Sequence, residues 1–336
     1  MYASDKETCP NKHQDMSTND VVISGMSGRF PLSDTTDEFA RNLFDGIDMV
    51  TADDSRWPPD LLDMNPRMGR LVNYGLFDST FFGVMEQMVE GFDPMARMLL
   101  EVTYEAIVDA EDANPQSLRG SQTGVYVAVS MYPMTDGYPE YLQPDIRKSL
   151  QSQFLTLYNL KTFYSSRISF VFDFKGPSMI VDTACSGSGT AFCLAMNDMK
   201  LGHIDQAVIC GAHMTLEPFQ LQVGQELGIL SSRGISAVLD QDADGFVKGE
   251  TVCALLLQHS ANARRLLATV RSSRMNIDGY KTIGMFFPSA EAQEELMVKT
   301  YKEANIDPLT LTYIEGHVTG TKCTGKTELL VVGVGQ

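Results

Sequence analysis

The sequence predicts an α/β fold built from layered mixed or parallel sheets, because three observations agree. Apolar runs that are typical of buried strands alternate along the chain with segments of helical spacing. A second series of strand, helix and strand, at residues 267–315, follows the plan of the first. With 336 residues, of which 43% are hydrophobic, the chain is long enough for one large domain or two fused halves.

The first 110 residues are predicted to hold one strand, two helices and an insertion between the helices. The first helix is amphipathic and has Ser33, Asp34 or Thr35 as its cap, and the second begins at a proline, as helices often do. The insertion is rich in Pro, Gly, Asp and Met and has weak periodicity, so we expect irregular chain over the core. In order, these segments are a strand at 20–25, a helix at 36–45, the insertion at 46–91 and a helix at 94–110.

The rest of the chain alternates strands and helices, and it divides into two units. The first unit continues with a strand at 123–130, a loop rich in Tyr and Pro at 131–141, a helix at 149–164, a strand at 178–182, a helix at 190–200, a strand at 206–210 and a hairpin over 244–246 and 249–257. The second unit has a strand at 267–275, a helix at 289–304 and a strand at 311–315. We therefore expect a flexible N-terminal tail at 1–19, a first half at 20–260 and a second half at 261–336.

Charge and composition argue against several classes of function. The formal net charge is −17, and the lysines and arginines are scattered, so binding to nucleic acid or to anionic membranes is not expected. No apolar run has the length of a membrane span, and the polar first residues lack the apolar core of a signal peptide. Five histidines and six cysteines show no zinc-ligand spacing, so we expect no metal site. We expect a cytoplasmic protein with reduced thiols.

Cys185 stands between a predicted buried strand and a predicted helix, in the run VDTACSGSGTA. Unpaired amides and the positive end of the helix dipole stabilise an anion at such a turn, which favours a reactive thiolate. The small residues that follow would let a carbonyl approach the sulfur and use backbone N–H groups as an oxyanion hole. The alternative is a buried structural cysteine, and this stretch alone does not separate the two.

Two further motifs resemble ligand-binding loops. Residues 320–327, GTKCTGKT, match a phosphate-binding P-loop, but only nine residues follow, and such domains place an acidic metal-binding strand after the loop. Residues 240–245, DQDADG, resemble the start of a calcium-binding loop, but the twelfth position is Thr251 instead of a glutamate. We expect a hairpin there instead of a calcium site.

A histidine follows the last predicted strand, which we expect to be buried. His317 lies in the run YIEGHVTGT, among small and hydroxyl residues. A lone histidine is more often structural or solvated than catalytic. Its combination with Cys185 reverses that balance, because a cysteine nucleophile and a histidine that can stabilise negative charge form a chemical pair.

Cysteine in DTACSGS and histidine in a loop similar to GTGT are the two anchors of the β-ketoacyl synthases, and the chain resembles that family over most of its length. Three stretches, at residues 50–57, 99–109 and 172–174, are most similar to the animal type I fatty acid synthase. Other matching runs are VISGMSGRFP at 22–31, RISF at 167–170, GPS at 176–178, NIDG at 276–279 and FPS at 287–289.

The resemblance implies a thiolase-like fold, with two similar halves layered α-β-α-β-α, and a homodimer. It implies that Cys185 accepts an acyl group from the phosphopantetheine arm of an acyl carrier protein domain, and that a malonyl thioester then loses CO2 and its carbanion attacks the acyl group. His317 would stabilise the enolate charge, and Thr319 and Thr321 would hold the pantetheine arm. No cofactor is expected to bind the chain directly.

The chain also departs from the family pattern. Val318 stands where the family has a glycine, and a β-branched residue fits poorly into left-handed backbone. The family's later lysine, its second histidine and its Gly-Phe-Gly-Gly turn have no counterpart, so we expect a complete first half and a truncated second half. The leading hypothesis is a β-ketoacyl synthase of fatty acid biosynthesis. A catalytically impaired paralogue or scaffold that binds acyl groups is the second, and a P-loop nucleotide-binding protein the third.

Overall fold

The computed structural model describes residues 17–58, 61, 63, 65–85, 89, 92–111, 114–130, 160–285, 287–321 and 330–334. Four predictions therefore lie wholly or largely outside the described residues: the tail at 1–19 apart from its last three residues, the loop at 131–141, most of the helix predicted at 149–164, and most of the P-loop match at 320–327.

A six-stranded mixed sheet is the centre of the molecule, and it has the order β3-β2-β4-β5-β1-β6. β2 pairs in parallel with β3 and β4, whereas β5 and β1 pair antiparallel with their neighbours. The strands of this sheet are β1 Val21–Arg29, β2 Thr123–Ala128, β3 Ser178–Val181, β4 Gln206–His213, β5 Thr251–His259 and β6 Ala268–Val270. A separate antiparallel pair joins β7 Tyr313–His317 to β8 Leu330–Val334.

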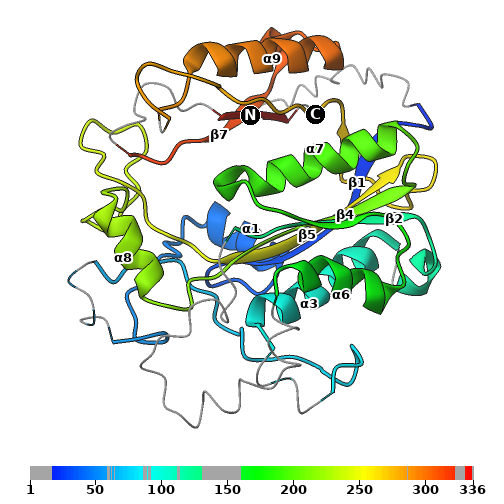
Figure 1. Ribbon diagram of the computed structural model, residues 1–336, viewed down its shortest axis with the longest axis horizontal. Coiled ribbons are helices and arrows are strands. Elements are labelled where there is room, and N and C mark those ends of the chain that lie inside the picture. Colours follow the sequence, from blue (N-terminus) through cyan, green and yellow to red (C-terminus); the bar gives the residue numbers. More distant parts are fainter. Residues whose placement is uncertain are drawn as a thin grey trace, which may run out of the picture.

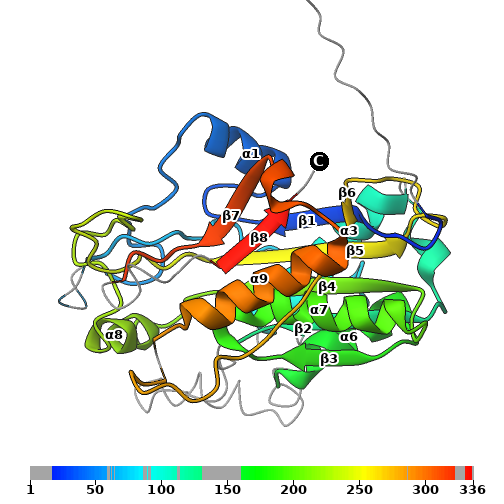
Figure 2. The same cartoon turned by 90° about the horizontal axis from the view of Figure 1, so that it is seen from above.

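Figure 1 shows five layers, and Figure 2 shows α9 Ala290–Ala304 lying over α7 Gly187–Lys200. From one side to the other, the layers are α3 Pro94–Glu111 with α6 Thr162–Phe172, the six-stranded sheet, α7, the β7–β8 pair and α9. Lys200 of α7 and Glu303 of α9 form an ion pair at 2.7 Å, which joins the middle layer to the outer layer of α9. The arrangement agrees with the predicted α-β-α-β-α order.

The core lies on both faces of the six-stranded sheet. One cluster joins α3 and α6 to the sheet, with Leu99 and Ile168 fully buried at its centre. The other joins α7 to the opposite face, with Ala191 of α7 packed among Ile209 and Leu257. Burial of this apolar surface is the main favourable contribution to the fold.

Several predicted elements are confirmed, because their signals are local. α1 Thr36–Phe44 begins after Thr35, whose hydroxyl accepts a hydrogen bond from the Glu38 amide at 3.2 Å, so Thr35 is the cap among the three candidates. α9 begins after Ser289, which caps the Ala292 amide in the same way. The described part of the insertion at 46–91 holds isolated bridges such as Thr51 to Met68 and is otherwise irregular.

Other predictions were wrong in extent or pairing. The described part of the chain has no hairpin at 244–257, because β5 lies alone between β4 and β1 and Phe246 makes only an isolated bridge with Leu230. The strand predicted at 267–275 is only β6, and it pairs with β1 at the edge of the first sheet instead of beginning a second one. A helix was predicted at 149–164. The described helix in this part of the chain is α6, which begins near the end of that range.

Short connecting elements complete the described chain. They are η1 Pro115–Leu118, η2 Ala184–Ser186, α8 Phe219–Glu226 and η3 Pro308–Thr310. None of the helices in the described ranges is long and apolar enough to cross a bilayer. Of these elements, η2 contains Cys185, and α8 accepts a hydrogen bond from Lys248 at the Gln220 carbonyl oxygen.

Candidate active site

Cys185 lies at the turn between β3 and α7, as the sequence predicts. It is the middle residue of η2, and α7 begins two residues later at Gly187. The predicted helix at 190–200 therefore begins three residues earlier than expected, which brings the cysteine to its first turn. Because β3, β2 and β4 are parallel and α7 packs on this sheet, Cys185 stands at the carboxyl end of β3, where α/β proteins commonly place reactive groups.

Two local features fix the backbone around the thiol. Ala184 has a φ of 50°, a left-handed conformation that costs a non-glycine residue about 1–3 kcal/mol and is found mostly at functional sites. Gly187 lies against β2, where an added Cβ would be 3.1 Å from the Cβ of Ala128, so the start of α7 approaches the sheet closely. The turn is thus held by packing on a rigid sheet.

The first amides of α7 are not capped by the residue that precedes the helix. Ser186 makes no side-chain cap hydrogen bond, because its hydroxyl donates instead to the Thr183 carbonyl oxygen at 2.8 Å. Amide groups at the start of a helix favour a nearby anion. The arrangement suits a thiolate at Cys185 or an oxyanion that forms beside it.

The cysteines differ in access to solvent. Cys185 is exposed, Cys193 and Cys210 are buried, and Cys253 is intermediate. Burial raises the pKa of Cys193 and of Cys253, and it raises the pKa of Cys210 to about 12. The alternative interpretation of Cys185 as a buried structural cysteine is therefore wrong.

The sequence analysis missed two basic residues, Lys248 and His213. Lys248 interacts electrostatically with both Cys185 and His213. Burial, reinforced by the charge of Lys248, lowers the pKa of His213 to about 4. His213 is the last residue of a strand, as His317 is, and this position was the available signal. Lys248 stands in GFVKGE, which was interpreted only as part of a hairpin.

His317 is the last residue of β7, where it pairs with Leu330 of β8. The strand predicted at 311–315 is shifted to 313–317, and all five of its residues are exposed, so the expectation of a buried strand was wrong. In the described chain no hydrogen bond joins His317 to Cys185. Val318 has no positive φ, so this backbone accommodates the valine without the expected strain.

The loop after His317 reaches the segment that precedes Lys248. The amide of Gly245 donates to the Gly320 carbonyl oxygen at 3.1 Å. The hydroxyls of Thr319 and Thr321, both half-buried, lie 3.2 Å apart. One segment, residues 245–248, thus contacts the threonine loop at one end and interacts with Cys185 at the other. Asp244, from the calcium-like run, accepts hydrogen bonds from the hydroxyls of Ser231 and Ser232, so it is part of a local loop network.

Sequence models of one family match nearly the whole chain. The model of the beta-ketoacyl synthase N-terminal domain matches residues 18–263, and that of the C-terminal domain matches residues 267–333. The second match includes the P-loop-like run at 320–327, so this run belongs to the matched synthase domain and does not indicate a nucleotide-binding domain.

Individual relatives agree with these matches. A fatty acid synthase from Anser anser anser is 38% identical over 306 residues, which are 90% of this chain and 84% of that sequence. Lovastatin diketide synthase lovF from Aspergillus terreus is 36% identical over 76% of this chain, which spans only 10% of that synthase.

Solved structures show the same fold. The ketosynthase from module 6 of the bacillaene synthase of Bacillus subtilis 168 has a TM-score of 0.79 and 29% identity, over 90% of this chain and 52% of that one. The oxazolomycin ketosynthase domain from Streptomyces albus has a TM-score of 0.81 and 28% identity, over 92% of this chain and 56% of that one. The chain thus spans about half the length of these structures. It has the thiolase-like fold and belongs to the β-ketoacyl synthase family of condensing enzymes.

Proposed function

We propose that the chain forms β-ketoacyl thioesters in fatty acid biosynthesis, by joining an acyl group held on Cys185 to a malonyl thioester. The observation that carries this proposal is the exposed thiol of Cys185 at the uncapped start of α7, in a chain that both family domains match. The catalytic role of Cys185 and the roles of His317, Thr319 and Thr321 are parts of the proposal.

In the first step, Cys185 takes the acyl group. Its sulfur attacks the carbonyl carbon of an acyl thioester, a new C–S bond forms, and the C–S bond to the carrier breaks. The proton of the Cys185 thiol leaves with the carrier thiol. Backbone amides at the start of α7 are suited to stabilise the oxyanion of the tetrahedral intermediate, because Ser186 does not cap them.

In the second step, the malonyl thioester loses CO2, and the electron pair of the broken C–C bond forms an enolate. The enolate carbon attacks the acyl carbonyl, a C–C bond forms, and Cys185 leaves as a thiolate. His317, an exposed residue at the end of β7, would donate to the enolate oxygen.

The substrates would arrive on the phosphopantetheine arm of an acyl carrier protein domain. The half-buried hydroxyls of Thr319 and Thr321, 3.2 Å apart, are suited to hydrogen bonds with the amides of such an arm. We also expect a homodimer and a cytoplasmic location, as the family resemblance implies. The fatty acid synthase from Anser anser anser, at 38% identity, supports fatty acid synthesis over polyketide synthesis.

The purified chain tests the proposal directly. After incubation with an acyl thioester, mass spectrometry should find one acyl group on the peptide that contains Cys185, and Cys185→Ser should abolish it. Radiolabelled malonyl thioester should release labelled CO2. A folded chain that binds acyl thioester without covalent transfer would support the acyl-binding scaffold instead.

A further inference from the structure

Lys248 lies three residues before β5, at the end of the sheet where β4 ends. Along β4, the residues that face α7 alternate, and Ala207 and Ile209 pack in the same cluster as Ala191 and Ala195 of α7. The next residue on that face is Gly211, where an added Cβ would lie 2.8 Å from the hydroxyl of Ser188. Each step along the strand thus approaches the N-terminal end of the helix.

The next residue on this face after Gly211 is His213, which therefore lies beyond Ser188, toward Cys185. His213 pairs across the sheet with Thr251 of β5, and Lys248 precedes Thr251 by three residues. The register of β4 and β5 brings Lys248 to the same end of the sheet. This placement agrees with the electrostatic interactions that Lys248 makes with His213 and Cys185.

The Lys248 side chain has a defined position. Its ammonium group donates to the Gln220 carbonyl oxygen in α8 at 3.0 Å, and its own carbonyl oxygen accepts from the Gly69 amide at 2.9 Å. Of the two basic groups here, His213 is neutral at physiological pH, because burial lowers its pKa to about 4. Burial also lowers the pKa of Lys248 from its ordinary value of 10.5, and the charge of Cys185 opposes that shift. Lys248 is thus the group of the pair that carries the positive charge.

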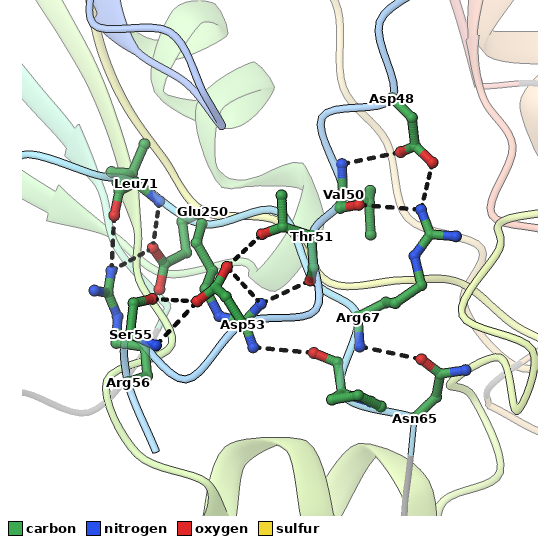
Figure 3. A network of polar contacts seen from close by, with 12 residues as sticks. Asp48, Val50, Thr51, Asp53, Ser55, Arg56, Asn65, Arg67, Leu71 and Glu250 are labelled. Carbon is green, nitrogen blue, oxygen red and sulfur yellow. Dashed lines mark hydrogen bonds and ion pairs between the residues drawn. The ribbon is translucent and has the colours of Figure 1, made fainter. Parts of the chain in front are cut away.

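A buried ion pair holds the segment two residues beyond Lys248. The Glu250 carboxylate is fully buried and accepts hydrogen bonds from Arg56 at 2.7 Å, from the Leu71 amide at 2.8 Å and from the Thr215 amide at 3.0 Å. Figure 3 shows Arg56 and Leu71 converging on Glu250. Because Thr215 is two residues after His213, this one carboxylate ties the insertion to both segments near Cys185.

We propose that Lys248 is a positioning residue for the Cys185 thiolate, holding a fixed positive charge beside the thiol at the start of α7. The proposal rests on the function proposed above only in taking Cys185 as the acyl-accepting thiol. The ammonium lowers the energy of the thiolate, while the thiol proton passes to solvent. The other charged group on the turn, the Asp182 carboxylate, pairs with Lys161 at 3.0 Å and so opposes the thiolate less.

The test measures the rate at which iodoacetamide alkylates Cys185 between pH 5 and pH 10, by peptide mapping of the full 336-residue chain. Lys248→Met should slow alkylation of Cys185 about tenfold at pH 7, because the thiolate loses the positive charge near it. Lys248→Arg should restore the wild-type profile, because it keeps the charge.

The matched control is Lys175→Met, which removes an exposed lysine that pairs with Asp173 before β3. It should leave the profile unchanged. The proposal is overturned if Lys248→Met keeps the wild-type profile, or if Lys175→Met moves it equally. If Lys248→Met does not fold, Lys248→Gln takes its place, and a wild-type profile in that variant overturns the proposal. Alkylation needs no acyl substrate, so its outcome is independent of whether acyl transfer occurs.

Discussion

Cys185 and His317 both stand where a strand ends, but the regions that hold them differ. Cys185 follows the six-stranded sheet, which is packed on both faces by buried clusters. His317 ends a strand whose five residues are all exposed, and the neighbouring helix α9 has no buried residue. The comparison teaches that Cys185, the proposed nucleophile, is held by a packed core, whereas His317 is held by the pairing of β7 with β8 and by its loop's contact between Gly320 and Gly245.

The largest effect is expected from the histidine, because the role proposed for it is chemical. His317→Ala should lower malonyl decarboxylation about a hundred- to a thousandfold, the usual cost of losing one oxyanion donor. Acyl transfer to Cys185 should persist, since the packed region supplies it. Labelled CO2 release and intact mass measure the two steps separately.

The control for this variant is His203→Ala, which changes an exposed histidine paired with Asp198 beyond the C-terminal end of α7. It should leave both steps unchanged. Equal loss of acyl transfer and decarboxylation in His317→Ala would show that the two regions do not act separately.

The next effect concerns stability, and it compares a helix from each region. Leu99→Ala on α3 removes a side chain that is fully buried, so we expect the free energy of unfolding to fall by about 2–5 kcal/mol. Val298→Ala on α9 changes a residue that is 59% exposed, and we expect a change within about 0.5 kcal/mol. Urea unfolding of both variants measures the difference. Similar losses in both would mean that α9 packs as tightly as α3.

A smaller effect is expected from pH. Burial raises the pKa of Glu101 on α3 to about 7, from an ordinary value of 4.5. The folded chain then holds a proton that the unfolded chain has lost between these values, so the contribution of Glu101 to stability falls as pH rises from about 4.5 to 7. Glu101→Gln should remove this part of the decline, which thermal unfolding at pH 5 and pH 8 would detect.

Glu295→Gln on α9 is the matched control in the exposed region. A hydrogen bond from Lys299 lowers the pKa of Glu295, and the pair is exposed, so the change should be small. If Glu101→Gln leaves the difference in melting temperature between the two pH values as it is in wild type, Glu101 does not titrate between them.

The sequence predicts the parts of this structure that depend on near neighbours. Thr35 is one of the three predicted caps of α1, and α9 begins one residue after its predicted start at Ser289, because these signals act within one helical turn. His317 and the threonine loop were found through family resemblance, which a strand-end histidine alone would not have justified.

The rest depends on contacts between distant segments. β6 joins β1 and not a second sheet, and β5 separates β4 from β1, which no local pattern specifies. Lys248 and His213 come to the same end of the sheet through the register of β4 and β5, and Lys248 interacts electrostatically with Cys185. In the sequence, nothing distinguishes Glu250 from any other charged residue before a strand. Its three hydrogen-bond partners are Arg56, Leu71 and Thr215, which are distant in the sequence.

The central claim is that the packed region makes Cys185 the reactive thiol of this chain. Brief iodoacetamide treatment of the native protein, followed by peptide mapping, tests it most directly among the cysteines of the described chain. We predict that Cys185 is labelled first, that Cys253 and Cys193 follow slowly, and that Cys210, whose pKa burial raises to about 12, is protected until the protein unfolds. Labelling of Cys193 or Cys210 before Cys185 in the folded protein would contradict the account.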